Sequence, residues 1–358
     1  MNFASKAALY LGGFSAMALS NAVVPILSDM TSDSAIQGAV YSAYFLGAFL
    51  MVFTAGWLSD KIGRAPLIKI GLAGTFLSSI IFWFTYPEIY SAVALRFAEG
   101  IFTGIFVSAA LSFVNSQEDH KKLSGVYVAL LNLGMVAGLV VTGFIASIHL
   151  YLGVLIFGIL TGAAVLFSVF FKDENVSEGA ASVSKIFTIA KYHIWLWIGI
   201  CIFTGTTGVV TSMYPEMSGF SPEITGIITA LMSIATAVAV YAASKTKYFS
   251  GLTSVRACAV VLAVSVPLAW FTPLGMILLG VVYGFICVAV MNYIAESGEP
   301  QGVMNGLYYT VQYAGMALLP FLFGFAVFLS GYLGIFIVTG ILCLAAGLLI
   351  VRCRCYIR

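Results

Sequence analysis

The chain has 358 residues, of which 61% are hydrophobic and only 8% are charged, and its formal net charge is +2. Water-soluble domains carry roughly a quarter charged residues, so this composition excludes a soluble enzyme, a nucleic-acid-binding protein and a receptor with a folded extramembrane domain. The charged residues must lie in short loops between long apolar segments that cross a lipid bilayer.

Turn residues and charges divide the chain into apolar segments, each close to the roughly 20 residues that a membrane-spanning helix needs. Twelve helices are expected, at about 7–28, 35–57, 65–85, 88–114, 124–148, 150–171, 193–214, 222–243, 254–271, 273–295, 303–329 and 331–352. The sequence therefore predicts an all-α, polytopic membrane protein.

The longest polar interruption lies between the sixth and seventh segments. It divides the chain into an N-terminal six-helix bundle (1–171), a cytoplasmic linker (172–192) and a C-terminal six-helix bundle with a short basic tail (193–358). The linker includes a run of small residues and is expected to be flexible. Two six-helix units of similar length are a recurrent plan of secondary transporters, so we interpret the halves as internal repeats.

The lysines and arginines indicate how the chain crosses the membrane. Of the sixteen basic residues, all but Arg96 fall in the segments that are cytoplasmic when the N-terminus starts inside. The connections on the other side contain acidic residues, namely Asp29, Asp33, Glu88, Glu216 and Glu223. This asymmetry follows the positive-inside rule and predicts that both termini are cytoplasmic.

The loop after the second segment reads GWLSDKIGRA, from Gly56 to Ala65. It resembles the G-x-L-x-D-R-x-G-R-K pattern of the major facilitator superfamily, with a lysine in place of the first arginine and an alanine in place of the last lysine. The resemblance implies a cytoplasmic gate formed by Gly56, Asp60, Lys61, Gly63 and Arg64. In that family the aspartate pairs with a neighbouring arginine and with the N-terminal end of a helix in the other half.

The fourth segment contains Arg96, and Glu99 follows it one helical turn later on the same face. Burying either charge alone would be costly, so the two residues form either a structural ion pair or a site where Glu99 takes up a proton or Arg96 meets an anionic substrate. The run from Arg96 to Gly100 resembles the R-x-x-Q-G pattern of the same family, which is linked to proton coupling. Here Glu99 replaces the glutamine and supplies a titratable carboxylate.

The fifth segment carries three glycines, Gly134, Gly138 and Gly143. Glycines four residues apart allow close helix contact, so helix packing alone accounts for them. They also resemble the family's antiporter pattern G-x-x-x-G-P-x-x-G-G, but Leu139 replaces the proline and Thr142 a glycine. Antiport is therefore favoured, while symport and uniport remain open.

Polar and aromatic residues within the segments predict a substrate cavity near the midplane. Asn21, Tyr308 and Gln312 are the proposed lining, together with Arg96. Because such a cavity has many aromatic rings and few fixed charges, it favours a hydrophobic or amphipathic organic molecule over a polyanion.

No cofactor, metal or nucleotide site is predicted. The pair Met213 and Met217 has the spacing of a copper(I) site, but Pro215 disturbs that geometry and packing is the favoured interpretation. The expected partners are a small-molecule substrate, protons and the lipid bilayer of the cell membrane, with no nucleic acid, and the protein is expected to be a monomer.

Three functions fit these patterns. The first is a proton-coupled exporter of a small organic compound, related to drug/proton antiporters. The second is a symporter or uniporter for a nutrient such as a sugar or a carboxylate. The third is a membrane scaffold or sensor that keeps the fold without transporting anything.

Overall fold

The computed structural model describes residues 3–85, 88–117, 120–171, 183–245, 251–299 and 301–350. These residues form helices and no strand, which confirms the all-α fold class. In chain order the helices are α1 (Phe3–Ala22), the 3-10 turn η1 (Val24–Ile26), α2 (Leu27–Met30), α3 (Ser34–Ile62), α4 (Arg64–Thr85), α5 (Ile89–Asn115), α6 (His120–Ile145), α7 (Leu152–Ser168), α8 (Val183–Tyr192), α9 (Ile194–Ser218), α10 (Pro222–Ser244), α11 (Gly251–Phe271), α12 (Leu274–Glu296) and α13 (Gln301–Ile350).

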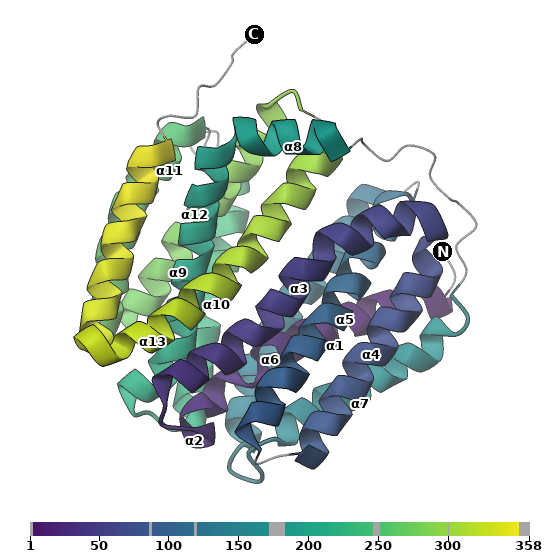
Figure 1. Cartoon of the computed structure of the whole chain (residues 1–358), viewed down its shortest axis with the longest axis horizontal. Coiled ribbons are helices and arrows are strands. Elements are labelled where there is room, and N and C mark those ends of the chain that lie inside the picture. The colour runs from purple at the N-terminus through teal and green to yellow at the C-terminus, as the bar shows by residue number, and fades with distance from the viewer. Residues whose placement is uncertain are drawn as a thin grey trace.

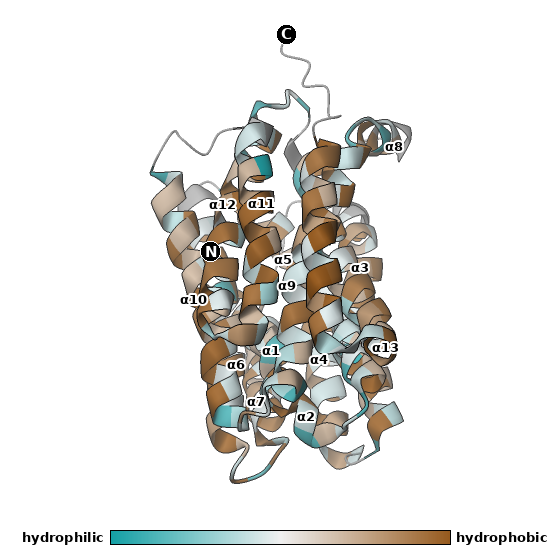
Figure 2. Ribbon diagram, turned by 90° about the vertical axis from the view of Figure 1, so that its left-hand side faces the viewer, coloured by the Kyte–Doolittle hydropathy of each residue, from teal (hydrophilic) through white to brown (hydrophobic). Residues whose placement is uncertain are grey.

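Ten stretches of the described residues are long and apolar enough to cross a membrane. The helix α7 adds a shorter apolar span of 17 residues. The last stretch contains two spans, because Gly331 interrupts α13 with a positive φ of 65°. The described residues thus contain the twelve expected spans, and hydrophobic residues cover their length while hydrophilic ones gather near the two ends (Figure 2).

Local chemistry explains where several helices end. The Asp33 carboxylate caps α3 by accepting hydrogen bonds from the backbone N–H groups of Ala35 (2.8 Å) and Ile36 (3.3 Å). At the other end of α3, Gly63 has a φ of 87° and permits the sharp turn into α4. Within the first expected span, at about 7–28, α1 ends at Ala22, because Pro25 has no N–H to continue its hydrogen bonds.

The helices form two bundles, α1–α7 and α9–α13 (Figure 1). In the first bundle α1 packs on α6 and α7, α3 on α5, and α4 on α5 and α7. The second bundle repeats this order: α9 packs on α13, α10 on α12, and α11 on α12 and α13. The recurrence of the packing order supports the interpretation of the halves as structural repeats.

The segment expected to be a flexible linker contains the helix α8, which crosses one end of the second bundle (Figure 1). Ile189 anchors α8 in the apolar core of this bundle, whereas Phe187 on the same helix is 73% exposed. Residues 172–182 of the expected linker lie outside the described residues.

The two bundles contact each other mainly through α3 with α13 and α6 with α10. We call the end with Asp33, Glu216 and Glu223 the acidic end, and the opposite end, with the α3–α4 turn, the basic end. At the acidic end the Ser34 hydroxyl donates to the carbonyl oxygen of Gly324 (3.1 Å), and the Gln37 amide donates to the Glu216 carboxylate (3.1 Å). The halves are therefore joined at the acidic end.

Two pairs of glycines show that the halves separate toward the basic end. In each pair, Gly125 with Gly143 on α6 and Gly306 with Gly324 on α13, the residues are 18 positions apart. Eighteen residues make five full turns, about 27 Å of helix, so both members face the same side. A Cβ atom on Gly143 or Gly324 would press on the backbone of the other half, but one on Gly125 or Gly306 would have no described atom within 4 Å.

Candidate functional site

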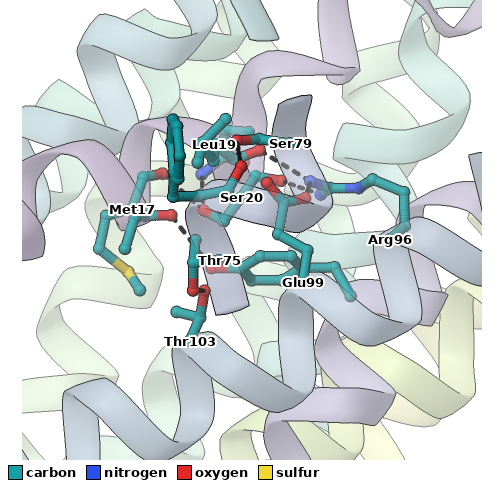
Figure 3. Close-up of polar contacts among 12 residues, drawn as sticks. Met17, Leu19, Ser20, Thr75, Ser79, Arg96, Glu99 and Thr103 are labelled. Carbon is teal, nitrogen blue, oxygen red and sulfur yellow. Dashed lines mark hydrogen bonds and ion pairs between the residues drawn. The ribbon is translucent and has the colours of Figure 1, made fainter. Parts of the chain in front are cut away.

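The charged pair of the fourth span lies in the interior of the first bundle. The side chains of Arg96 and Glu99 are 0% and 3% exposed, and the Arg96 Nη1 atom lies 2.5 Å from the Glu99 Oε2 atom. Both side chains point from α5 toward α1 (Figure 3). Among the described residues, the second carboxylate oxygen, Oε1, is buried with no hydrogen-bond partner.

The early end of α1 explains why Arg96 can be buried there. The last carbonyl groups of a helix have no partner within that helix, and they carry its negative partial charge. The Arg96 guanidinium donates to two such groups, the carbonyl oxygens of Leu19 (3.0 Å) and Ser20 (2.8 Å) (Figure 3). Asn21 lies beside them, 4% exposed, with its amide donating to the Ser20 hydroxyl (3.1 Å).

An aromatic ring from α3 completes the surroundings of the pair. The Arg96 Cζ atom lies 4.5 Å from the centre of the Tyr44 ring, which is a favourable cation–π distance. The Tyr44 hydroxyl donates to the carbonyl oxygen of Ala16 on α1 (3.0 Å). Close packing of α3 on α5 is possible because Gly100, the residue after Glu99, lies directly against the backbone carbonyl of Tyr44.

A second polar cluster lies in the other half, among α9, α12 and α13. The Gln312 amide donates to the hydroxyls of Tyr308 (2.8 Å) and Tyr283 (3.2 Å). The Tyr283 hydroxyl is also 3.2 Å from the Thr204 hydroxyl. Tyr283, Tyr308, Thr204 and Cys287 line a small pocket whose other walls are apolar. The pocket lining contains no charged side chain.

The motif after the second span forms the end of α3 and the start of α4. Gly56 packs against the Ser108 side chain of α5, and Gly63 makes the turn. Arg64 is buried rather than solvated: it donates to the hydroxyls of Ser112 (3.0 Å) and Ser116 (2.6 Å) on α5. The Asp60 and Lys61 side chains, which the sequence also assigns to the gate, lie outside the described side chains.

Replacing Arg64 with lysine is expected to lower the free energy of unfolding by about 1–2 kcal/mol, because an ammonium group cannot keep the geometry of both serine contacts. Thermal unfolding of the detergent-solubilised protein measures this. A matched control is Lys69→Ala, since the Lys69 ammonium makes an exposed contact with the Val169 carbonyl oxygen. Equal unfolding temperatures for Arg64→Lys and the unmodified protein would contradict the prediction.

Comparison with known proteins identifies the family. A model of the Major Facilitator Superfamily matches residues 9–320. The chain belongs to the Major Facilitator Superfamily. It is accordingly a multi-pass membrane protein.

Members of the superfamily with similar sequences include the tetracycline resistance protein, class C, of Escherichia coli. It is 29% identical over 162 residues, which are 43% of this chain and 41% of that protein. A multi-drug resistance efflux pump PmrA homolog of Lactococcus lactis is 34% identical over 115 residues, 31% of this chain and 28% of the relative. The chain thus spans less than half the length of these curated relatives.

The solved structure of the nucleoside transporter NupG shares the fold. Its TM-score is 0.75, and the match covers 99% of this chain and 100% of that one at 13% sequence identity. At this level of sequence identity the likeness concerns the fold alone, and it extends over nearly the whole chain.

The glycines of the fifth span lie in two different interfaces. Gly134 and Gly138 press against the backbone of Phe14 and Ala18 on α1, whereas Gly143 presses against Pro222 of the other half. The first two therefore pack α6 within its own bundle. The third holds the two halves of this superfamily member together at the acidic end.

The structure brings some predicted site residues together and separates others. In the first bundle Asn21 and Arg96 both donate to Ser20, Asn21 to its hydroxyl and Arg96 to its carbonyl oxygen, while in the second bundle Gln312 donates to Tyr308. The structure describes no hydrogen bond between these two groups. Sequence reasoning missed Thr204, Tyr283 and Cys287, because hydroxyl and thiol groups within an apolar span are common packing residues and no motif marks them.

Proposed function

We propose that this protein is a secondary transporter that exports a small organic solute in exchange for protons. The observation that carries the proposal is the buried Arg96–Glu99 pair, in which one carboxylate oxygen of Glu99 has no described partner. An ionisable group at membrane depth usually marks an ion or substrate path, and a free carboxylate oxygen is a position that a proton can occupy. The names of the tetracycline and multidrug relatives support export as the direction.

Transport requires that the substrate site face each side of the membrane in turn. The halves are joined at the acidic end and separate toward the basic end. The positive-inside rule places the basic end in the cytoplasm, so this is the state in which the site faces the cytoplasm. Rocking of one bundle against the other would expose the same site to the outside. We propose that the protein does this as a monomer in the cell membrane, with both termini in the cytoplasm.

One of the two polar clusters binds the proton and the other binds the substrate. Arg96 and Glu99 with Asn21 provide the proton site in the first half, and Tyr308 and Gln312 provide hydrogen bonds to the substrate in the second. The pocket beside Tyr308 is too small to hold a whole organic molecule, but its uncharged and otherwise apolar walls suit contact with the hydroxyl, carbonyl or amide groups of an amphipathic substrate. The buried Arg64 contacts and the rest of the gate motif act at the basic end.

Reconstitution into liposomes tests the proposal. With tetracycline and ethidium as probe substrates, an imposed pH gradient is expected to drive accumulation against the concentration gradient by the unmodified protein. Glu99→Gln keeps a hydrogen-bond acceptor for Arg96 but cannot take up a proton, so gradient-driven transport is expected to fall by at least about tenfold while substrate exchange persists. Movement of neither probe under any gradient, with folded protein, would count against this function.

A second titratable group provides the matched control. Burial lowers the pKa of His193, although the nearby Glu299 carboxylate opposes the shift, so this imidazole is neutral at pH 7. It lies at the start of α9, where its Nδ1 atom is 3.0 Å from the Tyr293 hydroxyl. His193→Gln is therefore expected to leave the proton dependence unchanged. If His193→Gln removes it and Glu99→Gln does not, the proton site is wrongly assigned.

A further inference from the structure

Two neighbouring aromatic residues of α3 contact different parts of the molecule. The Tyr44 ring lies against the Arg96 guanidinium, in the interior of the first bundle. The next residue, Phe45, stacks on Tyr313 of α13, with the ring centres 6.2 Å apart and the planes inclined by 28°. One short stretch of backbone therefore touches both the charged pair and the opposite half.

The position of Tyr44 is coupled to the position of the charged pair. Its side chain is fully buried, and its hydroxyl is held by the Ala16 carbonyl oxygen of α1 (3.0 Å). Its backbone carbonyl lies against Gly100, directly after Glu99. A change in the position of Arg96 or of α5 must therefore displace Tyr44, and with it this part of α3.

The contact between Phe45 and Tyr313 lies between the joined acidic end and the basic end, where the halves separate. Phe45 is 11 residues from Ser34 on α3, and Tyr313 is 11 residues from Gly324 on α13. Ser34 and Gly324 are bonded at the acidic end, so both rings lie about 16 Å from that contact. Further along α13, at Gly306, no described atom of the other half is near. The aromatic pair thus lies between the joined end and the open end.

The second aromatic residue also adjoins the uncharged cluster. Tyr313 directly follows Gln312, whose amide donates to the hydroxyls of Tyr308 and Tyr283. The two residues of the Phe45–Tyr313 contact are thus direct chain neighbours of Tyr44, which touches the charged pair, and of Gln312, which belongs to the uncharged cluster.

We propose that Tyr44 is a positioning residue that transmits the charge state of Glu99, through Phe45, to the contact between the two halves at Tyr313. The proposal rests on the proposed function. While Glu99 is ionised, it neutralises Arg96. Once Glu99 is protonated, the Arg96 charge depends on two carbonyl oxygens and the Tyr44 ring, so its attraction to that ring increases and α3 is drawn toward it. The two protonation states then favour different separations of the halves.

Among the residues that the structure describes, few other charged or titratable groups face the pair. Arg96 lies on the same helix as Glu99, and Tyr41 and Tyr44 face them from α3. Tyr313 faces Tyr44 from the other half. Where α1 contacts the pair it contributes carbonyl oxygens. A pH response that disappears with Glu99→Gln therefore reports on this carboxylate.

A distance measurement tests the proposal without any substrate. Tyr90 and Leu274 are 78% and 66% exposed at the acidic ends of the two halves. Cysteines at these positions, in a full-length protein whose six native cysteines are replaced by serine, accept spin labels. The distance between the labels is then recorded in lipid nanodiscs from about pH 5 to pH 8. This distance is expected to change with pH, and the pH dependence is expected to be lost in Glu99→Gln.

The decisive variants alter the aromatic contacts. Tyr44→Leu is expected to change the ratio of the two states at low pH by about tenfold and to flatten the pH response, because it removes the cation–π contact. Tyr44→Phe keeps the ring and is expected to keep the response. Phe45→Leu and Tyr313→Leu are each expected to flatten it as well, which keeps the test decisive if Tyr44→Leu does not fold. The control Phe82→Leu removes a buried ring that packs on Tyr151 and should leave the response intact.

Two results would overturn the proposal, and they are distinguishable. If Glu99→Gln abolishes the pH response while Tyr44→Leu and Tyr313→Leu retain it, the aromatic route is wrong and the proton site stands. If Glu99→Gln retains the pH response, both the route and the assignment of the proton site are wrong. Additivity of Tyr44→Leu with Glu99→Gln in a double-mutant cycle would likewise count against the route.

Discussion

Arg96→Met is expected to destabilise the protein by about 3–5 kcal/mol, because it leaves the Glu99 carboxylate buried without its positive partner. The two carbonyl oxygens of α1 that accept hydrogen bonds from Arg96 also lose their donor. A loss of this size is a large share of the stability of an ordinary domain, so little folded protein should reach the membrane. The yield and unfolding temperature of the detergent-solubilised protein measure the effect.

The double variant Arg96→Met with Glu99→Leu separates stability from function. Removing both charges eliminates the unpaired buried carboxylate, so most of the stability is expected to return. The carbonyl oxygens of Leu19 and Ser20 remain without a donor, and recovery is therefore incomplete. The double variant should fold but show no proton-driven transport. A folded double variant with intact proton coupling would show that the pair is only structural.

Gly324→Leu is expected to abolish transport and to open the acidic end. A side chain at Gly324 would collide with the backbone of α3 at Ser34 and Ala35, where the two halves are bonded. Forcing these backbones apart costs about 1–3 kcal/mol in the joined state but nothing in a state where the acidic end is open. The equilibrium between the two states should therefore shift toward the open acidic end.

The matched control is Gly306→Leu on the same face of α13, where a new Cβ atom would have no described neighbour within 4 Å. Gly306→Leu should leave the equilibrium between the joined and the open acidic end close to that of the unmodified protein. Labelling of a cysteine placed at Ser34 by an impermeant maleimide measures the opening. Equal labelling in the Gly324→Leu and Gly306→Leu backgrounds would contradict the prediction.

Much of the fold could be predicted because a bilayer imposes simple rules on sequence. The lengths of the apolar segments and the spacing of charges predicted the helices to within a few residues at most ends. The helix over Val183–Tyr192 was not predicted, because this short amphipathic helix lies within a polar segment that was expected to be a flexible linker.

The candidate site could be predicted only in part. Arg96 and Glu99 were identifiable because charges at membrane depth are costly and rare. The role of Tyr44 as their aromatic partner depends on α3 packing against α5, which Gly100 permits. Likewise, Gln312 was a plausible lining residue, but Tyr283 and Thr204 join it only because α9, α12 and α13 meet at that depth.

The sequence by itself determined that the chain spans a membrane in two six-helix halves, that its basic residues gather at one end, and that one charged pair is buried within a span. These properties follow from the free energy of transferring each segment from water into the bilayer, which depends on the residues of that segment alone. Only the tertiary structure decided which residues surround that pair, that the halves meet at the acidic end and part toward the basic end, and that Phe45 meets Tyr313 between them. Such contacts depend on the relative placement of helices far apart in the chain, and similar apolar surfaces allow many placements.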